Sequence, residues 1–241
     1  MPLDLFQKAL IESRKHTNLI TYHMLGDPLY HKNICSYLNL TKEYNLKVEI
    51  TTTGVYLKDF DLLLKDPIKQ INFSLDALFY SNLDTRKYLN KIFEFCEYKI
   101  NTKSSIFINL RIQNLAKNKA LIDSIASKFN VNINSSNTRL SSKIKLVLTR
   151  NFQWNEFSNI YSNNGFCYAL KGHIGILANG DIVPCCMDVN GAMILGNINL
   201  DSIQKALSSP RAKNMILGFK NNILLEESCK KCDYRNRFLK A

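Results

Sequence analysis

The chain has 241 residues, of which 46% are hydrophobic, and a formal net charge of +12. This length suffices for one substantial hydrophobic core, or for a main domain with a smaller appendage, so disulfide bonds are not needed for stability. No basic segment leads into an apolar stretch at the start, and the apolar runs are far shorter than the roughly 20 residues that span a bilayer, so we expect a cytoplasmic protein without membrane contacts.

The basic residues are spread along the chain instead of forming a block. A clustered basic patch is the feature that favours contact with nucleic acid. We therefore do not expect nucleic acid to be a partner.

Hydrophobic periodicity predicts a helix over 3–15 and then a regular alternation of strands and helices. Such alternation favours an α/β fold in which parallel strands are joined by right-handed helical crossovers. We predict one domain of this kind over 1–150. Its strands are expected at 18–24, 46–53, 68–75, 105–112 and 143–148, and its later helices near 32–45, 57–65, 84–98 and 115–129.

The pattern changes after residue 150. Residues 151–164 are rich in Asn, Ser and aromatic residues and are interpreted as a linker to a smaller module over 165–241. The module opens on a predicted hairpin, because apolar residues at 174, 176, 182 and 183 flank Asn179-Gly180, a favoured two-residue turn. A turn and a helix follow, with Asp201 as the expected N-cap.

Five of the seven cysteines lie in this module, and four of them have a regular spacing. Cys167 and Cys185 flank the hairpin in a C-x12-G-x4-C pattern whose glycine is Gly180, and Cys229 and Cys232 form a C-x2-C pair. In a reducing cytoplasm such spacing indicates metal ligation, and an all-sulfur shell favours zinc or an iron–sulfur cluster. The alternative is that the cysteines are small buried apolar side chains.

Three cysteines fall outside this set. Neighbouring side chains of an extended segment point to opposite faces, so Cys186 is expected in the core or beside the metal site while Cys185 is a ligand. Cys35 and Cys96 stand alone on predicted helices, where core packing is their expected role.

The cysteine pattern, with its Pro-Cys-Cys end and the LGNI that follows it, resembles the SPASM module over about 165–235. This module carries an auxiliary 4Fe-4S cluster at the C-terminus of many radical S-adenosylmethionine enzymes. The resemblance implies that Cys167, Cys185, Cys229 and Cys232 hold such a cluster.

The region before the module resembles the partial (β/α) barrel of the same enzymes. Its first predicted strand runs into LGDPL (25–29), where the family has a Gly-Glu-Pro type motif that contacts the amino group of S-adenosylmethionine. The resemblance implies that Gly26, Asp27 and Pro28 contact this cofactor, with Asp27 in place of the usual Glu. The alternative for Asp27 is a helix cap.

Later strands carry further matches. The stretch TTTG, ending at Gly54, resembles the family's Thr-Asn-Gly. In the same comparison, Ser74 in INFSLDA would face the cofactor, and Arg111 in INLRI would meet its carboxylate. The alternative for both is packing at the rim of the barrel.

The chain also departs from the family. Radical S-adenosylmethionine enzymes hold their catalytic cluster through a CxxxCxxC loop after the first strand, and these 241 residues contain no such motif. We therefore expect an N-terminally shortened protein without the first barrel strand, with no catalytic residues and no reductive cleavage of the cofactor by this chain alone. An open edge at strand 18–24 and poorly covered apolar residues of the first helix, Leu3, Phe6 and Leu10, then predict poor solubility or a homodimer through this edge.

Two other classes of function compete with this interpretation. One is a non-catalytic iron–sulfur subunit for electron transfer or peptide binding, and the other is a zinc protein with four cysteine ligands that contacts nucleic acid. The resemblance makes a peptide or protein the expected substrate class, but no residue pattern specifies a reaction.

Overall fold

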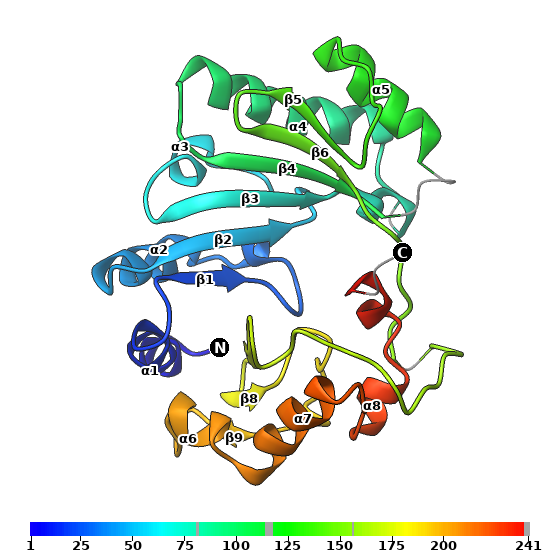
Figure 1. Ribbon diagram of the computed structural model, residues 1–241. Helices are drawn as coiled ribbons and strands as arrows, with labels where there is room; N and C mark the ends of the chain where they lie inside the picture. Colours follow the sequence, from blue (N-terminus) through cyan, green and yellow to red (C-terminus); the bar gives the residue numbers. More distant parts are fainter. Residues whose placement is uncertain (81, 114–117, 156, 239–241) are drawn as a thin grey trace. The chain divides into compact units, whose positions relative to one another are not determined.

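The computed structural model describes residues 1–80, 82–113, 118–155 and 157–238. The chain divides into two compact units. We call Thr17–Asn151 the sheet unit, and Met1–His16 together with Phe152–Ala241 the cysteine unit. Figure 1 shows the elements of both, coloured along the sequence. Within the described residues, no helix combines the length and the hydropathy needed to cross a membrane.

The sheet unit is built on one mixed sheet with the strand order β1-β2-β3-β4-β6-β5. Every neighbouring pair is parallel except β5 and β6, which are antiparallel. The strands, in chain order, are β1 (Leu19–Tyr22), β2 (Lys47–Thr52), β3 (Ile68–Ser74), β4 (Phe107–Ile112), β5 (Asn137–Ser141) and β6 (Ile144–Leu148).

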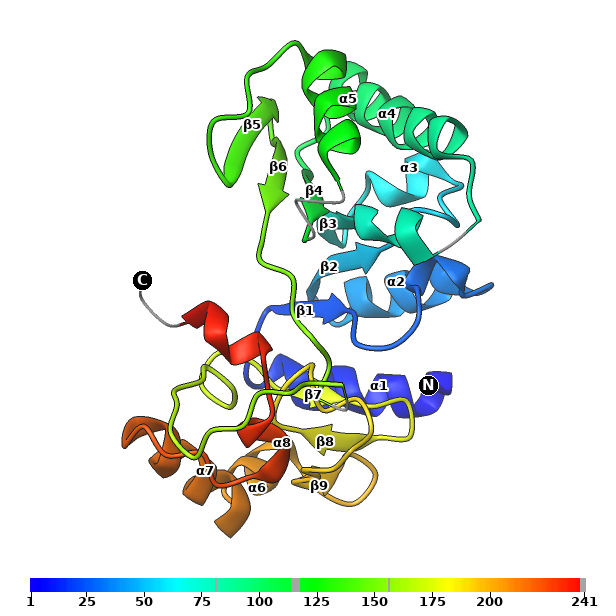
Figure 2. The same cartoon turned by 90° about the vertical axis from the view of Figure 1, so that its right-hand side faces the viewer.

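The α-helices of the sheet unit gather on one face of this sheet (Figure 2). They pack on alternate strand residues, with Ile50, Phe73 and Leu110 fully buried against Ile92 and Phe95 of α4. The helices are α2 (Ile34–Glu43), α3 (Phe60–Leu63), α4 (Thr85–Asn101) and α5 (Lys119–Phe129), with two short 3-10 helices, η1 (Pro28–Tyr30) and η2 (Leu75–Tyr80). Burial of this apolar face is the main source of stability for the unit.

The predicted alternation of parallel strands and helices is confirmed, with one strand missed. The missed strand is β5, whose sequence NTRLS is polar and exposes alternate side chains, so it gives no hydrophobic run to detect. The helix expected over 115–129 begins in the structure at Lys119, and residues 115–117 of that prediction lie outside the described residues.

The opposite face of the sheet carries polar side chains. Asn72 of β3 pairs in register with Asn109 of β4, and Ser74 pairs with Arg111. The Asn72 side-chain oxygen accepts hydrogen bonds from Gln70 (3.1 Å) and Asn109 (2.9 Å). Parallel sheets are usually covered by apolar side chains on both faces, so a polar face is a feature that packing alone does not explain.

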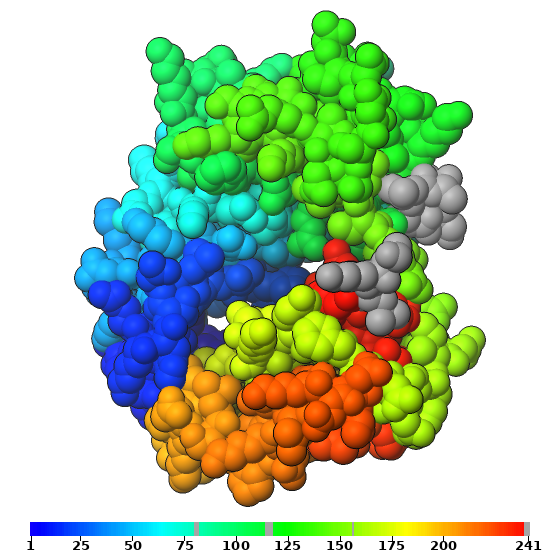
Figure 3. Space-filling model, viewed as in Figure 1, coloured from blue at the N-terminus to red at the C-terminus, as the bar shows by residue number. Residues whose placement is uncertain are grey.

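The cysteine unit contains a small antiparallel sheet in the order β7-β8-β9 and several short helices. In this unit, α6 and α7 form a continuous band in the space-filling view (Figure 3). The elements are α1 (Leu3–Arg14), β7 (Gly175–Ile176), β8 (Asp181–Val183), β9 (Gly196–Asn197), α6 (Ile203–Leu207), α7 (Pro210–Lys220), α8 (Glu227–Lys230) and the 3-10 helix η3 (Tyr234–Phe238).

Helix α1 belongs to the cysteine unit, although we expected it within a domain over 1–150. Its buried Leu5 and Ala9 pack in one cluster with residues such as Ile182 and Ile203, and the Glu12 carboxylate accepts a hydrogen bond from the Ile203 backbone N–H (3.3 Å). The expectation of poor cover was wrong for Leu10, which is only 1% exposed. Amphipathic periodicity shows that a helix has a partner but not which distant segment supplies it.

The hairpin forms at the expected place with a different turn. Leu177 and Asp181 face each other, joined by a hydrogen bond (2.9 Å), so the loop has three residues and not two. Gly180 has a φ of +92°, as a three-residue loop closing on a left-handed residue requires. The helix that follows is capped by Ser202, and Asp201 instead accepts the Asn197 backbone N–H (3.2 Å).

Candidate metal centre

Four cysteines of the cysteine unit come from three separate segments. Cys167 precedes β7, Cys185 follows β8, and Cys229 lies in α8. Cys232 follows α8 directly, and its backbone N–H donates to the Cys229 carbonyl oxygen (3.3 Å), which closes the tight turn of the C-x2-C pair. The hairpin therefore brings Cys167 and Cys185 to a common region, and α8 with its turn brings Cys229 and Cys232.

These four thiols are close enough to influence one another. Burial raises the pKa of all four, and for Cys185 to about 12. In addition, the thiols act on one another in pairs. In each of the six possible pairs, the charge of one thiol raises the pKa of the other. Like charges gathered at one buried place disfavour ionisation, which is the reason that a cation normally occupies such a site.

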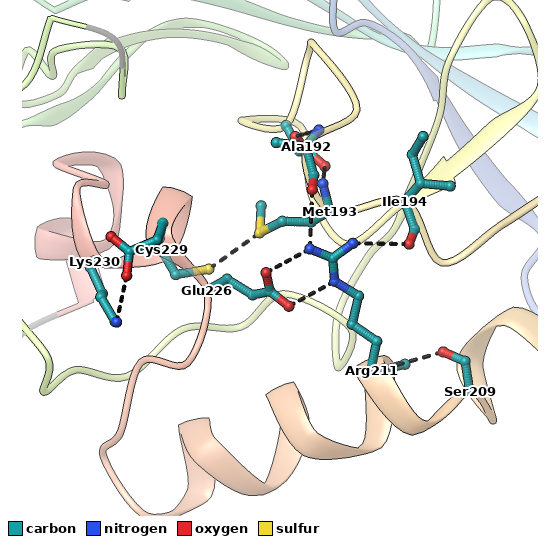
Figure 4. A network of polar contacts seen from close by, with 11 residues as sticks. Ala192, Met193, Ile194, Ser209, Arg211, Glu226, Cys229 and Lys230 are labelled. Atoms are coloured by element: carbon teal, nitrogen blue, oxygen red, sulfur yellow. Dashed lines mark hydrogen bonds and ion pairs between the residues drawn. The ribbon is translucent and has the colours of Figure 1, made fainter.

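The thiols also lie against an apolar cluster. Cys167, Cys185 and Cys229 pack on Met193, Phe219 and neighbouring apolar residues, and the Cys229 sulfur lies 3.7 Å from the Met193 sulfur (Figure 4). A dry surround of this kind limits solvent access, one of the factors that set the potential of a bound redox group.

Backbone N–H groups point at three of the sulfurs. Ala169 donates to Cys167 (3.4 Å), Met187 donates to Cys185, and both Tyr234 and Arg235 donate to Cys232. Hydrogen bonds to thiolate sulfur stabilise the anionic form and are typical of iron–sulfur sites.

Four thiolates can hold either a single zinc ion or an iron–sulfur cluster. Within the described ranges, no three histidine, cysteine, aspartate or glutamate side chains are arranged to hold one metal ion. A single zinc needs each sulfur at about 2.3 Å, so it would draw the thiols together. A four-iron cluster attaches each thiolate to a different iron and accepts a wider separation.

A charged network supports the segment that carries Met193. The Arg211 guanidinium of α7 pairs with Glu226 (2.7 Å) and donates to the carbonyl oxygens of Ala192 (3.0 Å) and Ile194 (3.3 Å), as Figure 4 shows. This pairing with Glu226 raises the pKa of Arg211. Glu226 immediately precedes α8, so one side chain ties α7, the 192–194 segment and the C-x2-C turn together.

Buried Asp188 completes the same support. Its carboxylate accepts the backbone N–H groups of Ala192 and Met193, both at 2.8 Å. No sequence pattern marks Asp188 or Arg211. The partners of Asp188 are backbone N–H groups, and the partners of Arg211 are distant from it in the sequence.

The remaining cysteines have different surroundings. Cys96 is completely buried in the core of the sheet unit, as expected, and burial raises its pKa to about 12. Cys35 was expected in the core and is exposed, because its face of α2 does not contact the sheet. Cys186 is half-buried beside Cys185 and raises that thiol's pKa.

In the sheet unit, the loop after β1 contains the residues matched to the cofactor motif. Asp27 caps η1, which begins at Pro28, by accepting the Leu29 N–H (3.0 Å), and Gly26 has a φ of +76°. The same carboxylate accepts the Thr52 hydroxyl (2.8 Å) and the Thr53 backbone N–H (2.8 Å) and hydroxyl (2.5 Å). A carboxylate has about four acceptor positions, and these four donors fill them.

The other two residues predicted to contact the cofactor lie side by side. Ser74 and Arg111 are register partners at the ends of β3 and β4. Burial and the charge of Arg111 together lower the pKa of His23, which follows β1. The structure thus brings Ser74 and Arg111 together, and it links Asp27 to the TTTG stretch, while their contact with a cofactor stays a prediction.

The comparisons with known proteins agree with this site. Residues 167–233 match the family model of SPASM, described as an iron-sulfur cluster-binding domain. The chain therefore contains a region, residues 167–233, that matches the SPASM domain. The matched range begins at Cys167 and includes Cys185, Cys229 and Cys232, so the SPASM domain contains the whole cysteine set. No curated protein sequence matches the chain.

Several solved structures share the fold of this chain. BtrN in complex with AdoMet and 2-DOIA has a TM-score of 0.63 at 15% identity, covering 97% of this chain and 80% of BtrN. The anSMEcpe protein with bound AdoMet has a TM-score of 0.60 at 13% identity, covering 98% and 81%. SuiB of Streptococcus suis bound to S-adenosylmethionine has a TM-score of 0.57 at 16% identity, covering 97% and 65%. The fold is therefore that of radical S-adenosylmethionine/SPASM enzymes.

Proposed function

We propose that the SPASM domain binds one auxiliary 4Fe-4S cluster through Cys167, Cys185, Cys229 and Cys232. The observation that carries this proposal is the mutual proximity of four half-buried thiols from three segments, because in every pair of them the charge of one thiol raises the pKa of the other. Four protein thiolates complete the shell of such a cluster, so no iron is left open for a substrate.

The match of residues 167–233 to an iron-sulfur cluster-binding domain supports a cluster over zinc. The hydrogen bonds from Ala169, Met187, Tyr234 and Arg235 to the sulfurs favour the present positions.

When bound, the cluster supplies one-electron transfer. The chain's own residues bury it against Met193 and Phe219 and donate hydrogen bonds to its thiolates. Arg211 and Asp188 hold the 192–194 segment in place beside Cys229. Together these contacts limit the exposure of the sulfurs to solvent.

For the sheet unit, we propose that S-adenosylmethionine lies at the ends of the strands near Gly26, Asp27, Pro28, Ser74 and Arg111. The support is the polar character of that sheet face and the adjacency of Ser74 and Arg111. The structures of BtrN and anSMEcpe, which share this fold, are described with bound AdoMet, and this supports the choice of cofactor. Because these 241 residues lack a CxxxCxxC motif, we do not propose reductive cleavage of the cofactor by them alone.

A peptide or protein is the proposed substrate class. One anSMEcpe structure is described with a bound peptide, whereas BtrN is described with 2-DOIA, so the shared fold accommodates different ligands. The polar sheet face is the surface on which we place the substrate.

Anaerobic purification tests the cluster proposal. After reconstitution with iron and sulfide, we expect a brown chain with about four iron and four sulfide atoms, which becomes paramagnetic on reduction with dithionite. A colourless chain that retains zinc and takes up no iron would contradict the proposal and support the zinc alternative.

A further inference from the structure

Arg235 is a buried cation in η3, three residues after Cys232. Its side chain is only 5% exposed, and its Nε is buried without a hydrogen-bond partner in the described parts of the chain. Its side chain also forms no ion pair with a described residue. A buried arginine is normally paired, so this side chain needs an explanation.

The surroundings place Arg235 beside two proposed ligands. Its positive charge acts on the thiols of both Cys167 and Cys232, and its backbone N–H donates to the Cys232 sulfur. The guanidinium packs so closely on Gly165 that an added Cβ there would lie 2.6 Å from Nη1. A glycine two residues before Cys167 thus leaves the space that the guanidinium fills.

An uncompensated charge in this position is costly in the empty chain. Removing a guanidinium from water is repaid only by an opposite charge or by hydrogen bonds. Four thiolates carry more negative charge than a 4Fe-4S core neutralises, so the loaded site is anionic and becomes more so when the cluster takes up an electron. The loaded site therefore supplies the missing counter-charge.

We propose that Arg235 is a positioning residue that compensates the charge of the cluster and raises its reduction potential. This inference rests on the proposed function of the cysteine site. A nearby cation stabilises the more negative, reduced cluster more than the oxidised one, and net charge is among the factors that set such potentials. Removing the cation therefore shifts the midpoint to more negative values.

The chain offers a matched control two residues away. Arg237 lies on the same 3-10 helix, and its guanidinium stacks 4.6 Å from the centre of the Tyr234 ring. It is half-buried, and its charge is not among the leading causes that shift the pKa values of the four thiols. Arg237→Gln thus removes a charge from the same element without removing the proposed compensation.

The test is a dithionite titration of the reconstituted full chain, followed by electron paramagnetic resonance. We expect Arg235→Gln to shift the cluster midpoint to more negative values, Arg235→Lys to shift it less, and Arg237→Gln to leave it unchanged. An unchanged midpoint in Arg235→Gln, or an equal shift in Arg237→Gln, would overturn the inference.

Thermal unfolding of the empty and loaded chains separates compensation from a structural role. Arg235→Gln is expected to leave the empty chain at least as stable as the wild type and to reduce the stabilisation gained on loading. An equal loss of stability in both states would show a structural role and overturn the inference. If Arg235→Gln takes up no cluster while Arg235→Lys loads normally, loading itself requires the positive charge, which supports the inference. Failure of both variants to load would overturn it.

The two proposals fail in different ways. If the wild type binds no iron–sulfur cluster, the proposed function is wrong. If the wild type is loaded normally and Arg235→Gln behaves like Arg237→Gln, only the role of Arg235 is wrong.

Discussion

Asp27 joins the loop after β1 to the end of β2 through hydrogen bonds from Thr52 and Thr53. Its carboxylate accepts from Leu29, Thr52 and Thr53, and the Thr52 hydroxyl in turn accepts from the Gly54 N–H (3.0 Å). A ligand amine could reach this carboxylate only by displacing one of these donors. The residue that the family resemblance assigns to the cofactor thus also organises the loop around it.

Asp27→Asn should lower the free energy of unfolding of the sheet unit by about 1–3 kcal/mol, because an amide nitrogen would face existing donors and leave them unpaired. Denaturant unfolding followed by circular dichroism measures the change. Asp59→Asn is the control, since exposed Asp59 makes a helix-capping bond to Leu62 that Asn also supports. Equal stability of Asp27→Asn and the wild type would contradict the hydrogen-bond assignment.

In the cysteine unit, Arg211 holds separate segments together, as Asp27 does in the sheet unit. Arg211→Gln should destabilise that unit by about 1–2 kcal/mol, a value reduced by partial solvent screening, because the bonds to Glu226 and to two carbonyl oxygens are lost. Lys205→Gln, which removes the exposed pair with Asp201, should cost much less, because solvent screens that pair. Urea unfolding at low and high salt compares the two, and equal losses would argue against a special role for Arg211.

Cysteine spacing allowed the four candidate ligands to be named from the sequence, since Gly180 and the C-x2-C turn constrain them locally. Arg235 and Arg211 could not be found in this way. Their roles depend on Gly165, Glu226 and carbonyl oxygens that approach only after folding. In a chain with many basic residues, the sequence alone does not show which arginine is buried.

At the scale of elements, the hairpin between β7 and β8 sets the position of Cys185. Gly180 combines a positive φ with close neighbours, because an added Cβ would lie 3.0 Å from the Asn197 side-chain oxygen and 3.3 Å from Leu5. A side chain at this position therefore strains the turn and presses on β9 and α1.

Gly180→Ala should lower the stability of the cysteine unit by about 1–3 kcal/mol and reduce iron retention. Gly172→Ala is the control, since an added Cβ there meets its nearest neighbour at 3.8 Å and the stability should stay within about 0.5 kcal/mol. Thermal unfolding and iron analysis of the two variants check this. Similar behaviour of both would mean that the turn does not constrain the site.

Elements with a strong hydrophobic period were predictable, and those without one were not. Strands β3 and β4 place apolar residues on one face, and this pattern also predicted that helices cover that face. Polar β5 and the three-residue loop at Gly180 depend on pairing geometry that the sequence pattern does not contain. The placement of α1 with the cysteine unit depends on contacts across most of the chain's length.

At the scale of the whole molecule, the two units have separate hydrophobic cores. The proposed cluster joins segments within the cysteine unit only. Loading it should therefore stabilise residues 1–16 and 152–238 and leave 17–151 nearly unchanged, because binding energy at a preformed site adds to the folding energy of the segments it joins.

Hydrogen exchange measured on the empty and loaded chains tests this. We expect exchange to slow by roughly tenfold or more around Cys167, Cys185 and Cys229 on loading. Equal protection of both units on loading would mean that the cluster couples them, and the division into independent cores would not describe the chain's stability.

The central claim is that four particular cysteines share one cluster, and cysteine-by-cysteine substitution tests it most directly. Each of the seven cysteines is replaced by Ala, and bound iron and sulfide are measured after anaerobic reconstitution. The account predicts loss of most of the iron for variants at Cys167, Cys185, Cys229 and Cys232. It predicts near wild-type iron for variants at Cys35, Cys96 and Cys186. Full iron retention after loss of Cys229 or Cys232 would contradict it.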